Sequence, residues 1–202
     1  MKLDRFYLIV DSASWIERLA PYGVRFVQLR VKERSPEEVR KEIVAAKVFC
    51  ARAGVCLVVN DYWQQALEAG CDFVHLGQTD LETADVPALR RAHIKLGIST
   101  HDHAELDRAL GFDPDYVALG PIYPTTLKVM PWAPQGLGRI TEWKRLVGER
   151  PLVAVGGLTV ERLPGVFAAG ADSAAVVGDV TRHENPEARA REWFAASRES
   201  VA

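Results

Sequence analysis

Short apolar runs recur along the chain and alternate with amphipathic stretches long enough for one helix each. Runs this apolar suit strands that are covered on both faces, as in parallel sheets. The expected strands are FYLIV (6–10), FVQLR (26–30), CLVVN (56–60), FVHL (73–76), KLGIS (95–99), YVALG (116–120), LVAVG (152–156) and SAAVV (173–177).

The intervening stretches have helical patterns. Residues 36–54 show this most clearly, because Pro36 stands near the start, Gly54 stands just past the end, and the apolar positions fall on one face. That stripe consists of Val39, Ile43, Ala46, Cys50 and Ala53. Eight strands, each followed by a helix, predict one (β/α)8 TIM barrel domain over residues 1–202, with a doubly wound open sheet as the alternative.

Composition and charge restrict the partners. The 202 residues are 48% hydrophobic and carry a formal net charge of −2, so neither a nucleic-acid binder nor a membrane-surface binder is expected. The apolar N-terminal run is too short for a signal peptide, and no run approaches transmembrane length, which predicts a cytoplasmic protein. The cysteines lack metal-binding spacing, and Cys50 and Cys56 are expected to be buried thiols.

The second strand has polar residues in strict alternation. In VQLRVK, Gln28, Arg30 and Lys32 share one face, whereas the apolar residues between them share the other. If the apolar set packs under the helices, the polar set points into the mouth of the barrel. Two adjacent cations favour a phosphate or pyrophosphate ligand, and the alternative is an edge strand with solvated charges.

Carboxylates follow the next two strands. Asn60 and Asp61 end the third strand, and Asp80 follows the fourth. Two carboxylates beside an anion site suit Mg2+, which also keeps water and substrate oxygens as ligands. Either aspartate could instead cap a helix, and His75, within an apolar strand, is expected to be a hydrogen-bonded packing residue.

Other candidates lie at later strand ends. Ser99 and His101 follow the fifth strand, and His101 is a candidate general acid or base. No Ser–His–Asp relay is evident. Glycine-containing turns at 156–157 and 178 leave backbone amides open to an anion, although such turns also occur as plain connections.

The segment 120–138, GPIYPTTLKVMPWAPQGLG, is long and rich in Gly and Pro. Loops of this length in compact domains are usually functional or disordered. Its prolines limit its conformations, so we expect a partly preorganised lid over the mouth that carries Thr125 and Lys128.

Together, VQLRVK, VVNDYW, HLGQTDL, GISTHD, the 120–138 loop and VAVGGLT resemble the thiamine phosphate synthase family over nearly the whole chain. The resemblance implies a Mg2+-dependent transferase of thiamine biosynthesis on a TIM barrel. It would condense 4-amino-2-methyl-5-hydroxymethylpyrimidine diphosphate with a thiazole phosphate, or its carboxylated form, to give thiamine monophosphate and pyrophosphate.

The resemblance also implies site residues. Those for the pyrimidine diphosphate are Gln28, Arg30, Lys32, Asn60 and Lys128, with Ser99 at the pyrophosphate. Those for Mg2+ are Asp61 and Asp80. Those for the thiazole phosphate are Thr125, Gly157, Val177 and Gly178. Arg30, Lys32, Lys128 and Ser99 would act on the leaving pyrophosphate, which Mg2+ and the cations neutralise.

Two residues depart from the family pattern. Leu127 stands where a second Thr is expected, so Thr126 becomes an alternative phosphate contact, and Gly178 stands where a Ser is frequent.

The alternative functions are a thiazole tautomerase of the same fold, for which His101 would shuttle protons, and a non-catalytic phosphate-ligand sensor. Trp143 and Trp193 allow two interpretations: a surface for homo-oligomer formation, or packing on the barrel wall, which we favour.

Overall fold

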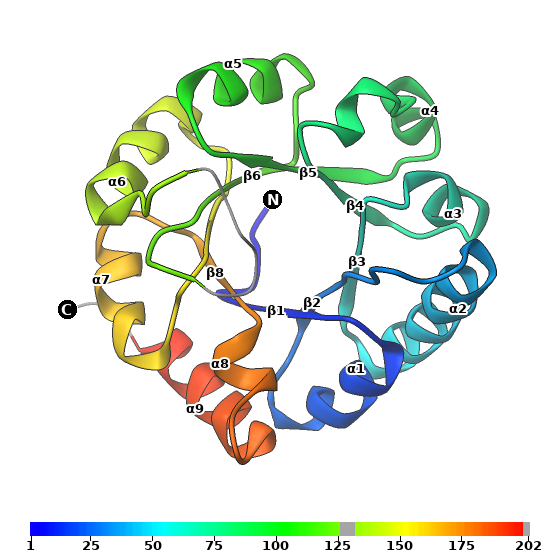
Figure 1. Cartoon of the computed structure of the whole chain (residues 1–202), viewed down its shortest axis with the longest axis horizontal. Helices are drawn as coiled ribbons and strands as arrows, with labels where there is room; N and C mark the ends of the chain where they lie inside the picture. The colour runs from blue at the N-terminus through cyan, green and yellow to red at the C-terminus, as the bar shows by residue number, and fades with distance from the viewer. Residues whose placement is uncertain (126–131, 200–202) are drawn as a thin grey trace.

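The computed structural model describes residues 1–125 and 132–199, and these form a closed eight-stranded parallel barrel surrounded by helices (Figure 1). The strands are β1 (Phe6–Val10), β2 (Phe26–Leu29), β3 (Cys56–Asn60), β4 (Phe73–Leu76), β5 (Lys95–Thr100), β6 (Tyr116–Leu119), β7 (Leu152–Val155) and β8 (Ser173–Val176). Each strand pairs with the next one along the chain. The (β/α)8 prediction is therefore confirmed, and the strand bounds agree with it within one residue at each end.

Helices follow the strands around the ring. The α-helices are α1 (Ala13–Leu19), α2 (Pro36–Ala53), α3 (Trp63–Glu68), α4 (Val86–Arg91), α5 (His103–Gly111), α6 (Gly136–Val147), α7 (Leu163–Ala168), α8 (Gly178–Thr181) and α9 (Pro186–Arg198). Within residues 1–125 and 132–199 there are also the 3-10 turns η1 (Ala20–Tyr22), η2 (Asp80–Glu82) and η3 (Val160–Arg162). No helix in the described part of the chain is long and apolar enough to cross a bilayer.

Pairing between the first and last strands closes the sheet. Phe6 pairs with Ala174, and Leu8 pairs with Val176, in parallel register. A doubly wound sheet leaves two open edges, so this pairing excludes that alternative.

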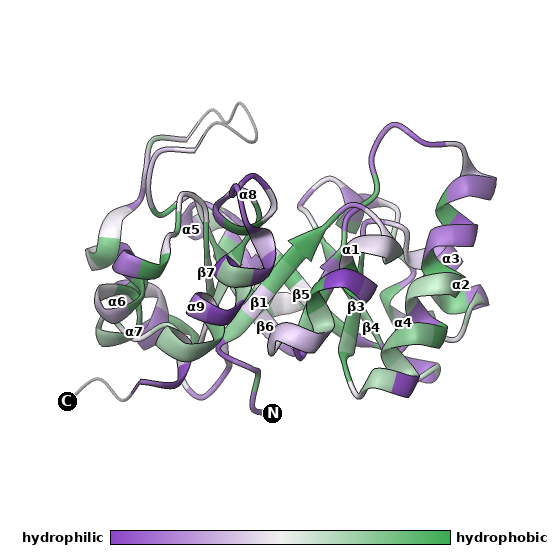
Figure 2. Cartoon of the chain, turned by 90° about the horizontal axis from the view of Figure 1, so that it is seen from below, coloured by the Kyte–Doolittle hydropathy of each residue, from purple (hydrophilic) through white to green (hydrophobic). Residues whose placement is uncertain are grey.

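Two apolar layers hold the barrel together. The outer layer lies between strands and helices, and it includes Val27 and Leu29 of β2. The inner layer fills the ring with aromatic side chains near the starts of the strands, where the rings of Tyr7 and Phe26 stack with centroids 3.8 Å apart. The inner layer fills the lower part of the barrel, and a cavity lies toward the carboxyl ends of the strands. Figure 2 shows α8 at that end and the N-terminus at the opposite one.

Helix α2 begins at a capping box. The Ser35 hydroxyl accepts a hydrogen bond from the backbone amide of Glu38, and the Glu38 carboxylate accepts one from the backbone amide of Ser35. The helix ends at Gly54, with a φ of 65°. The expected stripe is buried up to Cys50, whereas Ala53 is exposed in the last turn.

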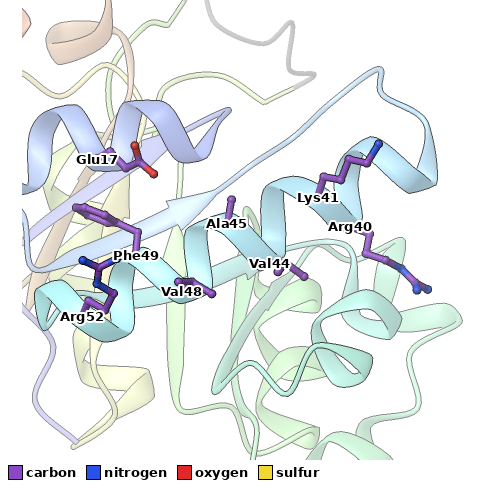
Figure 3. Close-up of a pocket in the computed structure, with 8 residues that line it drawn as sticks. All are labelled: Glu17, Arg40, Lys41, Val44, Ala45, Val48, Phe49 and Arg52. Carbon is purple, nitrogen blue, oxygen red and sulfur yellow. The ribbon is translucent and has the colours of Figure 1, made fainter.

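The outer face of α2 carries a second, exposed apolar stripe. Figure 3 shows Val44, Val48 and Phe49 between Arg40 at one end of a shallow hollow and Arg52 at the other. This hollow lies at the surface beside α2 and Glu17 of α1, and none of its lining residues stands at a strand end. It is therefore a different place from the barrel mouth.

Candidate active site

A cavity of about 1120 Å3 opens at the carboxyl ends of the strands. Residues at or just after the ends of all eight strands contribute to its wall. Because the aromatic layer closes the barrel below, a ligand here would meet mainly the polar side chains that follow each strand.

The alternating residues of the second strand line this cavity as a set. Gln28, Arg30 and Lys32 all reach its wall, while Val27 and Val31 are buried among the outer apolar residues. The backbone amide of Arg30 donates a 2.7 Å hydrogen bond to the carbonyl of Val10, which extends strand-like pairing beyond Leu29. The predicted orientation of the polar face is confirmed.

Asp61 and Asp80 line the cavity beside these cations. Asp61 has a positive φ of 64°, unusual for a residue with a side chain, and its backbone amide donates to the carbonyl of His75 at 2.9 Å. Its carboxylate forms an ion pair with Lys32. Positive φ values at such residues concentrate in functional sites, where the surroundings fix the strain.

Asp80 lies close to Asp61. One of its carboxylate oxygens accepts a 2.9 Å hydrogen bond from the backbone amide of Gly77. Burial raises the pKa of this carboxyl, and the negative charge of Asp61 raises it further. Asp80 does not cap α4, because Asp85 accepts the bond from that helix's first turn.

Asn60 and Ser99 also reach the cavity, from β3 and β5. Asn60 is 5% exposed. The Ser99 hydroxyl lies 2.7 Å from Nε2 of His75, whose Nδ1 is 2.7 Å from the hydroxyl of Tyr116. Burial lowers the pKa of His75 to about 4, so its ring is neutral near pH 7. The expectation that His75 is a hydrogen-bonded packing histidine is confirmed.

Glycines after β7 bring the loop that follows β6 against the cavity. Gly157 has a φ of 63°, and a Cβ there would lie 2.5 Å from the carbonyl oxygen of Pro124. The backbone amide of Tyr123 donates a 3.0 Å hydrogen bond to the carbonyl of Gly156. These contacts fix the base of the loop, and Thr125 lines the cavity. Thr126, Leu127 and Lys128 lie outside the described residues.

The turn after β8 forms the neighbouring part of the wall. Val177 and Gly178 line the cavity where α8 begins. Gly157 and Gly178 therefore border one side of the cavity, while the cations that follow β2 border another part of it.

Two arginines that the sequence reasoning missed border the glycine turns. Arg162 and Arg182 line the cavity, and the Arg162 guanidinium donates to the carbonyl of Gly157 while lying 4.2 Å from the ring centre of Tyr123. Both follow a strand only after several intervening residues. A search confined to strand ends therefore passes over them.

His101 lies in the cavity wall but already has partners. Its Nδ1 is 2.6 Å from the carboxylate of Glu105, and its ring stacks on Trp132 with centroids 3.9 Å apart.

Trp143 and Trp193 are fully buried, so the interpretation that they pack on the barrel wall is confirmed for both.

The cysteine expectation is partly wrong. All three cysteines are free thiols, but Cys56 is exposed, whereas Cys50 and Cys71 are buried. Cys56 is the first residue of β3, where the strand emerges at the end of the barrel remote from the cavity.

Comparisons with known proteins agree over nearly the full length. A family model described as thiamine monophosphate synthase matches residues 6–180. A protein named thiamine-phosphate synthase from Rhizobium etli is 60% identical over 197 residues, covering 98% of this chain and 97% of that protein. One of the same name from Klebsiella pneumoniae is 45% identical over 196 residues, covering 97% and 90%.

Solved structures show the same fold. A thiamine phosphate pyrophosphorylase from Pyrococcus furiosus superposes with a TM-score of 0.82 at 22% identity, covering 96% of this chain and 95% of that one. A 3-hexulose-6-phosphate synthase superposes with a TM-score of 0.71 at 19% identity, covering 95% and 99%. At these identities a likeness shows the fold alone, because one barrel fold carries many activities.

Proposed function

Because the chain belongs to the thiamine monophosphate synthase family, we propose that it is the transferase that joins an aminopyrimidine diphosphate to a thiazole phosphate. The products are thiamine monophosphate and pyrophosphate. With the carboxylated thiazole, CO2 is released as well.

One observation carries the proposal. Arg30, Lys32, Asp61 and Asp80 line a single cavity at the carboxyl ends of the strands. A diphosphate carries several negative charges, and adjacent cations and metal-binding carboxylates are the groups that hold and neutralise it. A thiazole tautomerase has no need of such a set, because its substrate has no diphosphate to release.

The carboxylates fit Mg2+. Asp61 and Asp80 both line the cavity and lie close to each other. In the part of the chain that the structure describes, no group of three His, Cys, Asp or Glu side chains could hold a metal, so these two carboxylates would be the protein's share of the ligands. Mg2+ commonly takes one or two carboxylates and completes its shell with water and substrate phosphates. When bound there, it would neutralise the charge that develops on the pyrophosphate.

The chain's own groups then bind and orient the pyrimidine half. The Gln28 amide nitrogen donates to Tyr7, which leaves the amide oxygen as an acceptor for the amino group of the pyrimidine. Arg30 and Lys32 receive the diphosphate oxygens, Asn60 contacts the same substrate, and Ser99 donates to the pyrophosphate. Lys128 is assigned to the same substrate because the 120–138 loop resembles that of the family.

The reaction needs no protein nucleophile. The bond between the methylene carbon and the diphosphate oxygen breaks, and its electron pair leaves with the pyrophosphate. The electron-rich aminopyrimidine stabilises the resulting cation, and the lone pair of the thiazole nitrogen forms the new carbon–nitrogen bond. Positioning and charge stabilisation supply the acceleration.

The glycine turns receive the thiazole phosphate. Gly157, Val177 and Gly178 line the cavity, and so does Thr125 of the loop. Gly178 contributes no hydroxyl, so backbone amides and a threonine, Thr125 or Thr126, bind this phosphate. Leu127, where the family pattern has a second threonine, carries no hydroxyl to donate.

Phosphorylated substrates do not cross membranes freely, and the three cysteines are free thiols. Both points support a cytoplasmic location. If copies of the chain form a homo-oligomer, Trp143 and Trp193 do not supply the contact, because neither is exposed.

One assay tests the function against its rivals. The purified chain is mixed with both substrates, with and without Mg2+, and pyrophosphate and thiamine monophosphate are measured. Condensation that depends on Mg2+ supports the proposal. Isomerisation of the thiazole alone would identify a tautomerase, and binding without turnover would identify a sensor.

A further inference from the structure

A continuous chain of polar side chains crosses the interior of the barrel and ends at Ser99 in the cavity wall; its other members are buried. The Gln28 Nε2 atom lies 2.9 Å from the Tyr7 hydroxyl, which lies 2.9 Å from the Tyr116 hydroxyl. Tyr116 lies 2.7 Å from Nδ1 of His75, and Nε2 of His75 lies 2.7 Å from the Ser99 hydroxyl. We call these five side chains the interior relay. They come from five strands.

Counting hydrogens gives the relay one direction. The amide nitrogen of Gln28 only donates, so Tyr7 accepts from it and gives its own hydrogen to Tyr116. Tyr116 then gives its hydrogen to Nδ1 of His75. The single hydrogen of the neutral imidazole is left on Nε2, where it is donated to Ser99.

The reverse direction leaves a hydrogen unused. If Nδ1 of His75 carried a hydrogen, Tyr116 would accept it and donate to Tyr7. Tyr7 would then accept two hydrogens, and its own hydrogen would have no acceptor among the side chains recorded around it in the described part of the chain. Tyr7 is 1% exposed, and an unpaired buried hydroxyl is costly.

The strands are shaped to hold this arrangement. Gly97 of β5 sits beside Tyr116, and a Cβ at Gly97 would come within 2.2 Å of the phenol ring and 2.6 Å of its hydroxyl. The ring of Tyr116 also stacks on His75, with centroids 5.5 Å apart and planes at 16°. The phenol therefore reaches His75 only because Gly97 has no side chain.

The relay ends at a hydroxyl in the cavity wall. The Ser99 hydroxyl accepts a hydrogen bond from Nε2 of His75, so the hydrogen of this hydroxyl is available to donate into the cavity. A hydroxyl that accepts a hydrogen bond becomes a stronger donor. We propose that Tyr116 and His75 are positioning residues that fix the Ser99 hydroxyl as a hydrogen-bond donor to an anionic oxygen of the substrate. This rests on the proposed function, in which that oxygen belongs to the pyrophosphate.

Two single variants and their combination test the relay by kinetics. Tyr116→Phe removes only the phenol hydroxyl, and we expect it to lower kcat roughly tenfold with little change in KM. In a Ser99→Ala background, the same change should lower kcat no further. Tyr22→Phe, on η1 away from the cavity, is the matched control. A loss of equal size in both backgrounds, or no loss at all, would overturn the proposal.

A second measurement needs no turnover. Ring 15N chemical shifts of His75, assigned by the signals missing in His75→Gln, report which nitrogen carries the hydrogen. We expect the Nε2–H tautomer in the unaltered chain and a mixture in Tyr116→Phe. An Nδ1–H tautomer in the unaltered chain would refute the relay even if the enzyme proves active. If no condensation is found, this arm still decides on the relay while the proposed function alone fails.

Discussion

Lys32 and Asp61, which lie on neighbouring segments after β2 and β3, form an ion pair in the cavity. A cation expected to bind substrate phosphate thus contacts a carboxylate expected to bind metal. If a diphosphate and Mg2+ bind as proposed, each side of this pair would gain a new partner of opposite charge. This pair would therefore exchange its partners on loading, and before loading the charges of Lys32 and Asp61 neutralise each other.

Asp61→Asn should impair the metal-dependent step. The variant keeps the size of the side chain but removes its charge, so we expect kcat to fall roughly 10²- to 10³-fold, as when an electrostatic stabiliser is lost. The Mg2+ concentration giving half-maximal rate should rise. Pyrophosphate release measured across Mg2+ concentrations tests this, with Glu149→Gln, an exposed change at the other end of the barrel, as control. Near-normal turnover at limiting Mg2+ would exclude Asp61 as a metal ligand.

Asp80→Asn should stabilise the metal-free protein while reducing activity. The pKa of Asp80 is raised by burial and by Asp61, so the folded chain binds this proton more tightly than the unfolded chain does. Stability from this carboxyl therefore falls as pH rises through the interval between its ordinary and raised pKa values. An uncharged Asn avoids that cost and can still accept from Gly77.

We expect the gain for Asp80→Asn to be under about 1 kcal/mol, because solvent screens a partly exposed charge. Urea unfolding at pH 7 in the presence of a chelator measures it. As the pH falls from above the raised pKa of Asp80 to below its ordinary value, the stabilities of the variant and of the unaltered chain should converge. A variant less stable than the unaltered chain at pH 7 would contradict the electrostatic account.

Gly157→Ala should weaken binding of the thiazole phosphate specifically. Its Cβ would meet the carbonyl of Pro124, so the base of the loop that carries Thr125 must shift. We expect KM for the thiazole phosphate to rise about tenfold or more and KM for the pyrimidine diphosphate to change little.

Gly54→Ala is the matched control for Gly157→Ala. Its φ of +65° is close to the +63° of Gly157, but a Cβ there meets nothing within 4 Å. In both variants, backbone strain should lower the free energy of unfolding by about 1–2 kcal/mol. At Gly157 only, overlap with the loop should lower it by a further amount of about 1–3 kcal/mol. If urea unfolding shows the same loss of unfolding free energy in both variants, the contact between Gly157 and the loop does not contribute to stability.

Gly97→Ala should disturb the interior of the barrel. The added methyl would overlap the ring of Tyr116, and forcing extra volume into a packed interior costs about 1–3 kcal/mol. Gly111→Ala, at the end of α5 with open space around it, should be neutral or slightly stabilising. Thermal unfolding of both variants compares them. If Gly97→Ala is as stable as Gly111→Ala, the ring of Tyr116 has room that the structure does not show.

Much of the fold and part of the site follow from patterns with short periods. Eight apolar runs predicted eight strands, and the alternation in VQLRVK predicted which face Gln28 and Arg30 present. Because all strands of a parallel barrel end at one face, residues such as Asp61 and Asp80 could be grouped without knowing their distances.

Other features depend on which strands face each other across the ring. Tyr7 and Tyr116 are 109 residues apart, and no local pattern indicates that their hydroxyls meet. Arg162 and Arg182 lie several residues beyond the strand ends, where position in the sequence does not indicate whether a side chain points into the cavity. The prediction that Cys56 is buried is wrong because it relied on the apolar neighbours of this residue. As the first residue of β3, Cys56 lies at the rim of the barrel and is exposed.

Closure of the ring through β1 and β8 has a consequence for how the chain is made. During synthesis β1 appears first, yet one of its edges has no partner until residues 173–176 have left the ribosome. Any sheet that forms around β1 before then has an unpaired parallel edge, the kind of edge through which unfinished sheets associate with one another. The last strand to be synthesised is the one that removes this hazard.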